Sequence, residues 1–175
     1  MMLKLTLIIS TLLIFLGCTE TKKITLVEKK PQIVISQNIV NVPIHIRDNG
    51  YNNFSTKIFT TQSELDSFLA KIKGQSSWNK KNNFFYTLSK QEIDFNRNSL
   101  LIYRFSEPSS SIVLATEVPT EIEQKITVKI GKKKSSGMMT SDMAYYALAY
   151  VVNKKIISVT FDDGKDSKTI TINNP

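Results

Sequence analysis

From residue 31 onward, apolar and polar residues alternate over many short segments, with the period of two that is typical of half-buried β-strands. At residues 126–130, for example, isoleucine and valine alternate with threonine and lysine. Many of the segments are rich in β-branched residues, and turn signals such as Asp48-Asn49-Gly50 separate them. The pattern predicts roughly eight to ten short strands. The most strand-like segment, residues 99–105, is expected at the centre of the sheet.

The pattern changes to a helical period at residues 61–73. Thr61 can act as the N-cap, Glu64 stands three residues later as in a capping box, and Gly74 provides a C-terminal stop. The apolar residues of this segment recur at i, i+3, i+4 and i+7 and form one stripe: Leu65, Phe68, Leu69 and Ile72. The sequence therefore predicts an α+β domain, mainly antiparallel β-sheet with one amphipathic helix.

Residues 138–152 fit two structures. Alanine and leucine at helical spacing fit a helix, whereas three tyrosines and the Val151-Val152 pair favour a strand. Asn153-Lys154 can then turn the chain back into residues 155–161, and we favour this hairpin. Asp162-Asp163-Gly164-Lys165 indicates a second hairpin turn.

The N-terminus has the layout of a secretory signal, with a positive start, an apolar run over residues 5–16 and a small residue, Gly17, before the cut. The run is shorter than the roughly 20 residues that a membrane span needs. Cys18, the only cysteine, follows at once. The arrangement resembles the bacterial lipoprotein signal, in which this cysteine becomes the first mature residue and its sulfur carries lipid. A free thiol is the alternative.

The predicted organisation is a signal peptide at residues 1–17, a polar tether at 18–30 and a single domain at 31–175. The lipoprotein resemblance implies two or three acyl chains such as palmitate on Cys18, enough for stable attachment to a membrane. Thr19 follows the cysteine in place of the aspartate associated with inner-membrane retention. We therefore expect the cell envelope as the location, with the outer membrane favoured and the domain facing the periplasm or the exterior.

Charge and cysteine content exclude several classes of function. The formal net charge is +8, and removing residues 1–17 removes only Lys4, which leaves 22 Lys and Arg against 15 Asp and Glu, or +7. Export argues against nucleic acid as a partner, so anionic lipid headgroups or an acidic protein face fit this charge better. A bias of the whole genome toward Lys, Asn and Ile would also account for the charge, and more simply. Without cysteine after Cys18, the domain has neither disulfides nor thiolate metal sites.

Candidate catalytic groups are few. The single histidine, His45, rules out paired-histidine zinc motifs and is expected on a solvated strand face. Aspartates around Gly164 loosely suggest calcium but lack a bidentate glutamate, and glutamates around Pro119 better fit a solvated turn than a glycosidase pair. These carboxylates are Asp162, Asp163 and Asp166, and Glu117, Glu121 and Glu123. We expect a protein that is not an enzyme and has no cofactor and no metal site.

Two loops, 107–111 and 131–137, and a group of tyrosines are candidates for a binding face. Tyrosine is enriched at protein interfaces because it combines apolar area with a polar tip. The alternative is that these tyrosines divide between core and solvent. The candidate binding residues are Ser109, Ser110, Lys132, Lys133, Lys134, Tyr145 and Tyr146.

Five short segments occur in a fixed order between residues 59 and 161. They are Thr61-Gln62-Ser63-Glu64-Leu65, Ile93-Asp94-Phe95, Ser99-Leu100-Leu101-Ile102-Tyr103, Ser109-Ser110-Ser111-Ile112 and Met139-Thr140-Ser141-Asp142-Met143-Ala144-Tyr145-Tyr146. In these segments the chain resembles the C-terminal domain of the protease complex subunit PrcB. The family tends to have a glycine near residues 109–111 and a proline near Tyr146, and this chain has neither. The resemblance implies a lipid-anchored accessory protein that binds and stabilises a partner without catalysis. In the family member that gives the name the partner is a surface protease, and the partner of this chain is a protease or another envelope protein.

Two functions therefore remain open. The first is a non-catalytic binding or assembly subunit at the cell envelope. The alternative is a periplasmic lipoprotein that binds a small ligand or a glycan. A pocket lined by Trp78 and tyrosines would favour the second, and a flat docking face would favour the first.

Overall fold

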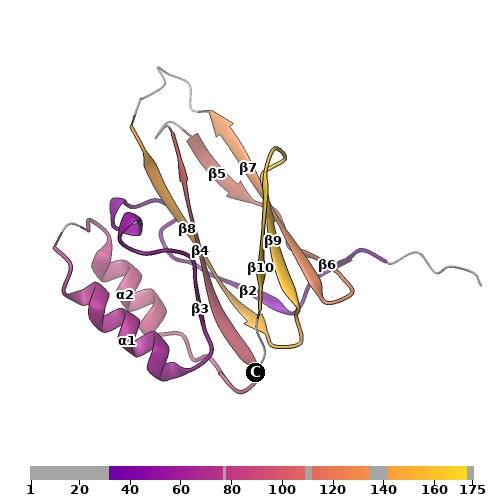
Figure 1. Cartoon of the computed structure of the whole chain (residues 1–175), viewed down its shortest axis with the longest axis horizontal. Helices are drawn as coiled ribbons and strands as arrows, with labels where there is room; N and C mark the ends of the chain where they lie inside the picture. The colour runs from indigo at the N-terminus through magenta and orange to yellow at the C-terminus, as the bar shows by residue number, and fades with distance from the viewer. Residues whose placement is uncertain (1–31, 77, 109–111, 135–141, 173–175) are drawn as a thin grey trace, which may run out of the picture. The chain divides into compact units, whose positions relative to one another are not determined.

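The computed structural model describes residues 32–76, 78–108, 112–134 and 142–172. These residues form three layers, namely a pair of helices, a central four-stranded sheet and an outer six-stranded sheet (Figure 1). The central sheet has the order β2-β8-β4-β3, with β2 (Ile39–Val42), β8 (Ala144–Asn153), β4 (Asn98–Glu107) and β3 (Lys57–Phe59). The predicted α+β class is confirmed, as is the central place of the strand over residues 99–105.

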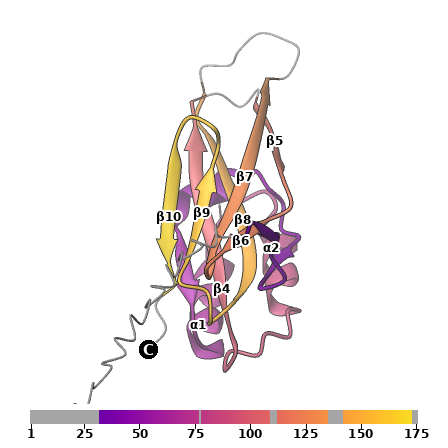
Figure 2. The same ribbon diagram turned by 90° about the vertical axis from the view of Figure 1, so that its right-hand side faces the viewer.

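The outer sheet has the order β1-β6-β7-β9-β10, and β5 also pairs with β7. Its strands are β1 (Val34–Ile35), β5 (Ile112–Thr116), β6 (Thr120–Ile122), β7 (Lys125–Lys134), β9 (Ser158–Asp162) and β10 (Ser167–Thr171). All pairings are antiparallel except that of β7 with β9. Figure 2 shows β10, β9, β7 and β5 following one another across this sheet.

Strands β4 and β8 are buried on both faces, so each of them alternates between two cores. Leu100 and Ile102 of β4 belong to the core beneath the helices, whereas Leu101 belongs to the core between the two sheets. In β8, Ala149 and Leu148 divide in the same way. The small alanines of β8 leave room for the helices, and its larger residues fill the space between the sheets. A strand covered on both sides needs a nearly continuous apolar run, which is why residues 138–152 also fit a helix. Residues 144–153 form a strand, as we favoured.

Helix α1 (Gln62–Lys73) matches the predicted helix. The Thr61 hydroxyl accepts a hydrogen bond from the Glu64 N–H at 3.2 Å, and the Glu64 carboxylate accepts one from the Thr60 N–H at 2.7 Å. The first is the usual bond of a capping box. In the second, the donor is the residue before the N-cap, Thr60, in place of Thr61. Gly74 ends the helix with right-handed dihedral angles, so its conformational freedom is not used there.

The sequence did not predict the second helix, α2 (Lys81–Ser89). Its N-cap, Lys80, makes no side-chain cap, and its aromatic residues favour strands when considered alone. Burial of Phe84 and Leu88 against α1 and the central sheet outweighs that local preference. Among the described residues, no helix is both long enough and apolar enough to cross a membrane.

Two further predictions about the C-terminal half are wrong. Strands β8 and β9 do not form a hairpin, because the turn at residues 153–157 carries the chain from the central sheet to the outer sheet, and the side chain of Ile156 is buried between them. Residues 131–134 do not belong to a loop, since they continue β7 and pair with β5. The hairpin of β9 and β10 is confirmed.

Four threonines lie in one row across neighbouring strands of the outer sheet. The pairings align Thr120 with Thr127, Thr127 with Thr160, and Thr160 with Thr169. The hydroxyls of Thr160 and Thr169 are 2.9 Å apart and hydrogen-bonded. This row alternates with buried residues such as Val128 and Val159, so it faces away from the core and makes the outer face polar.

A cluster of aromatic rings fills the core beneath the helices, and a short 3₁₀ helix, η1 (Asn49–Asn53), supplies part of it. Trp78 packs edge-on against Tyr51 with ring centroids 5.7 Å apart. The buried Asp48 carboxylate joins η1 to the start of α2, because it accepts the N–H groups of Gly50 and Lys80, each at 2.8 Å. The indole of Trp78 then covers Gly50 so closely that no side chain fits there.

We expect Gly50→Ala to destabilise the domain strongly. A Cβ at this position would lie 1.3 Å from Cδ1 of Trp78, so the buried indole would have to move. The free energy of unfolding should fall by about 3 kcal/mol, as for an overpacked core. This free energy can be measured by denaturant unfolding monitored through the fluorescence of Trp78, the only tryptophan.

Gly74→Ala is the matched control for this substitution. Its Cβ would lie 3.7 Å from the nearest atom, the carbonyl oxygen of Lys71, and its φ is −74°. An alanine fits that backbone, so stability should stay equal or rise by about 0.5 kcal/mol. Equal losses in the two variants would contradict the role given to the Gly50–Trp78 contact.

Candidate functional site

The structure separates the predicted binding residues. Ser109 and Ser110 lie outside the described residues, as does Cys18. Tyr145 and Tyr146 point to opposite faces of β8, so they cannot form one surface. Tyr146 is buried between the sheets and its hydroxyl donates to the carbonyl oxygen of Ile112 at 3.0 Å, which makes it a structural residue.

Tyr145 lies on the helix side of β8 and is half-buried. The guanidinium of Arg104 stands over its ring, 5.0 Å from the centroid, and the Arg104 Nε donates to the carbonyl oxygen of Tyr51. The two tyrosines therefore do not form one binding face. Tyr146 contacts β5 through Ile112, and Tyr145 contacts β4 through Arg104.

Lys132 is part of an ion-pair network. Its ammonium is 2.5 Å from the Glu107 carboxylate and also bonds the Asp163 carboxylate, and its side chain is 27% exposed. Hydrogen bonds from the Asp166 N–H and from Lys132 lower the pKa of Asp163 to about 2. Burial alone would lower the pKa of Lys132, but its bonds with Asp163 and Glu107 raise it. Lys132 therefore ties β7 to β4 and to the β9–β10 turn, while Lys133 and Lys134 stay exposed.

Replacing Lys132 by methionine should raise the pKa of Asp163 from about 2 toward its ordinary value of 3.8. The rise should be partial, because the Asp166 N–H still donates. The native pKa lies below that of the unfolded chain, so the carboxylate stabilises the fold fully above about pH 4. That contribution is lost as the pH falls through about 2.

An NMR titration of the Asp163 carboxyl carbon measures this pKa. Lys165→Met is the control, because Lys165 is exposed in the same turn and only its N–H bonds Asp163. If Lys132→Met and Lys165→Met left the pKa equally low, the ion pair would not be a cause of the shift.

One exposed cavity, which we call the β5 groove, lies between the edge of β5 and residues 44–47. Its volume is about 540 Å³ and its lining is mainly apolar: Ile44, His45, Ile46, Arg47, Ile112, Val113, Leu114 and Tyr146. Val113 is 60% exposed. Among the described residues β5 pairs only with β7, so its other edge has no strand partner. The groove lies beside the exposed lysines of β7, since Val113 and Ile112 are paired with Lys133 and Lys134.

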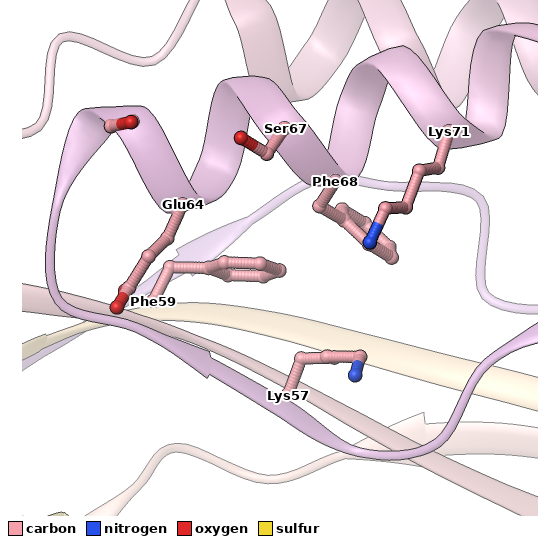
Figure 3. Close-up of a pocket in the computed structure, with 7 residues that line it drawn as sticks. Lys57, Phe59, Glu64, Ser67, Phe68 and Lys71 are labelled. Atoms are coloured by element: carbon pink, nitrogen blue, oxygen red, sulfur yellow. The ribbon is translucent and has the colours of Figure 1, made fainter.

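A second groove, which we call the α1 groove, lies between α1 and the edge strand β3 (Figure 3). It consists of two cavities of about 340 and 360 Å³ that share Lys57, Phe68 and Lys71. The floor is formed by Phe59 and Phe68, both buried. The remaining lining residues are Ser63, Glu64, Ser67, Asn53, Phe54, Ser55, Ile72 and Gln75.

The α1 groove is cationic. Lys57 extends from β3 and Lys71 from α1, and Figure 3 shows both ammonium groups pointing into the space between the two elements. Within the described part of the chain, neither makes an ion pair with a carboxylate. The nearby Glu64 carboxylate is held by Thr60, whose N–H lowers the pKa of Glu64.

Sequence reasoning missed the α1 groove, although its pattern is present. Ser63, Ser67 and Lys71 recur every four residues beside the apolar stripe of α1, and Lys57 and Phe59 alternate on β3. The sequence pattern does not predict the tertiary contact that places α1 beside β3.

The other candidate groups have local roles. The Asp162 carboxylate accepts the Gly164 N–H, and the Asp163 carboxylate accepts those of Lys165 and Asp166, so both serve the hairpin turn. Glu121 accepts from Ser36 and Asn38, and Glu117 is 4.0 Å from Lys129. His45 is exposed, as expected. In the described ranges, His, Cys, Asp and Glu form no group that could hold a metal ion.

Comparison with protein-family models, with curated proteins and with solved structures gives no match. The resemblance to the PrcB family therefore stays a prediction.

Proposed function

We propose that this protein is a lipid-anchored, non-catalytic binding or assembly subunit of the cell envelope, and that its partner protein docks on the β5 groove. The observation that carries the proposal is the exposed apolar side chain of Val113, beside Lys133 and Lys134, on an edge of β5 that no described strand pairs with. An apolar centre with a charged rim is the usual anatomy of a protein interface.

Other exposed apolar residues on nearby strands support a protein partner. The edges of β1, β2 and the β5–β6 connection display Ile35, Val40 and Val118, each at least 60% exposed. Soluble domains normally protect such edges with charges, proline or covering loops. A partner with an acidic, partly apolar face would satisfy both the exposed valines and the cationic rim.

The proposed anchor rests on the sequence. Cys18 would carry the acyl chains, and residues 18–30 would hold the domain away from the membrane. The outer membrane is the favoured location, on the evidence of Thr19. The PrcB resemblance supports a partner that this protein stabilises, a protease or another envelope protein.

The alternative function, binding of a small ligand or a glycan, has less support. Trp78 is 6% exposed and Tyr150 is 2% exposed, so neither can stack on a sugar ring. Both rings are instead packed in the cores on the two sides of the central sheet.

Cys18→Ala should abolish lipid attachment. Metabolic labelling with an alkyne analogue of palmitate should mark the wild-type protein and leave the variant unmarked, because only the thiol can take the diacylglyceryl group. Cys18→Ser is a second variant of nearly the same size. Undiminished labelling of either variant would reject the assignment of the anchor.

Partner recovery from detergent-solubilised membranes tests the docking face. The variant Val113→Asp/Lys133→Glu/Lys134→Glu replaces the apolar centre and reverses the rim but keeps Lys132, which holds Glu107 and Asp163. It should lower the recovery of co-purified protein by about tenfold or more. Lys155→Glu/Lys165→Glu changes two exposed lysines elsewhere and should leave recovery unchanged. Equal recovery with both variants would exclude the β5 groove.

A further inference from the structure

We propose that the α1 groove binds an extended, acidic peptide segment of a partner protein, which adds as a strand to the free edge of β3. This inference goes beyond the proposed function, because its surface and its ligand differ from those of the β5 groove. It rests on the shape of the α1 groove, on the strand that borders it and on its charge.

The groove is elongated. Its lining follows α1 from Ser63 to Gln75, just beyond the end of the helix, and its two cavities meet at Lys57, Phe68 and Lys71. Twelve residues of helix rise about 18 Å, which is the length of about five or six residues of extended chain. A compact metabolite would occupy only part of this length, whereas an extended peptide would fill it.

The bordering strand has an unused edge. Strand β3 pairs with β4 from Lys57, opposite Ile102, to Phe59, opposite Leu100. Among the described residues, no strand pairs with its other edge. The side chains of Lys57 and Phe59 point toward α1, so this strand borders the groove (Figure 3). Peptides bind such sites by main-chain hydrogen bonds to the edge, and their alternate side chains enter the groove.

The side chains of the groove determine which peptide fits. Lys57 and Lys71 supply two ammonium groups with no carboxylate partner in the described part of the chain. A carboxylate placed between them would gain two charge-assisted hydrogen bonds. The serine hydroxyls of Ser63 and Ser67 are further donors at the groove wall.

The floor adds an apolar requirement. Phe59 and Phe68 are 4% and 8% exposed and lie with ring centroids 5.1 Å apart. An apolar ligand side chain can cover the part of these rings that still meets water. The ligand is therefore a segment in which every second residue is in turn acidic and apolar, since the residues at every second position of a strand point to the same side and enter the groove together.

Fluorescence anisotropy can test this with the full chain in nanodiscs of zwitterionic lipid. The probe is a labelled, end-capped peptide of about six residues that has aspartate, leucine and aspartate at every second position and threonine between them, so that both kinds of side chain face the groove. It should bind more tightly than the matched peptide with lysine in place of aspartate. A version with proline at a central position should bind about tenfold more weakly or worse, because proline removes a strand hydrogen bond.

Charge reversal at the groove should remove this preference. Lys57→Glu/Lys71→Glu should weaken binding of the acidic peptide by about tenfold or more, and Lys155→Glu/Lys165→Glu should leave it unchanged. If the reversed variant lost its circular dichroism signal, Lys57→Gln/Lys71→Gln would replace it, with a smaller loss expected. The proposal would be overturned if the basic peptide bound as tightly as the acidic peptide. It would also be overturned if the proline version bound as tightly as the acidic peptide without proline.

Two controls distinguish a peptide site in the α1 groove from a membrane-binding surface and from the β5 groove. Vesicles of anionic phosphatidylglycerol should bind the wild-type chain and the Lys57→Glu/Lys71→Glu variant equally. If the Lys57→Glu/Lys71→Glu variant lost vesicle binding and the wild-type chain did not bind the peptide, the two lysines would be assigned to membrane binding and the proposal would be overturned. Peptide binding should survive in the Val113→Asp/Lys133→Glu/Lys134→Glu variant, so failure of the β5 docking face and failure of the α1 groove are distinguishable.

Discussion

The structure depends on one constraint, the burial of both faces of the β4–β8 pair. The two strands pair over ten residues each, from Asn98 opposite Asn153 to Glu107 opposite Ala144. One face needs a helical layer and the other needs a second sheet, because each face is apolar. The remaining elements serve these two needs. Helices α1 and α2 with η1 cover one side, and β7 and β9 bring Val128 and Val159 to the other.

The same constraint explains where the grooves lie. Strands β2 and β3 are much shorter than the pair they flank, so neither covers the whole length of its neighbour. Beyond β3 the edge of β4 is closed by a side chain, since the Thr56 hydroxyl bonds both the N–H and the carbonyl oxygen of Arg104. Beyond β2, Arg47 bridges Tyr146 of β8. One cavity remains between β3 and α1, and another remains between β5 and residues 44–47.

The sequence predicted the features that depend on interactions between residues close together in the chain. The cap at Thr61, the apolar stripe of α1 and the alternation in β7 each depend on residues within one element, and each is found in the structure. Helix α2 and the crossing after β8 depend on tertiary burial, of Phe84 in one case and Ile156 in the other. Pairing of Lys132 with Glu107 and Asp163 joins residues far apart in the chain, so a run of three lysines could not reveal which of them is neutralised.

The positions of the charged residues say more about binding than the net charge does. A net charge of +8 would suit any anionic surface. Yet Lys132 faces two carboxylates, and Lys129 is near Glu117 beside the polar row of threonines. The lysines without a carboxylate partner in the described ranges include those beside apolar floors, Lys57 and Lys71 over phenylalanine and Lys133 and Lys134 beside Val113. A flat membrane surface would meet such ammonium groups but would not enter the grooves beside them. A protein segment with both carboxylates and apolar side chains would meet the two together, which is the reason for proposing a protein partner at each groove.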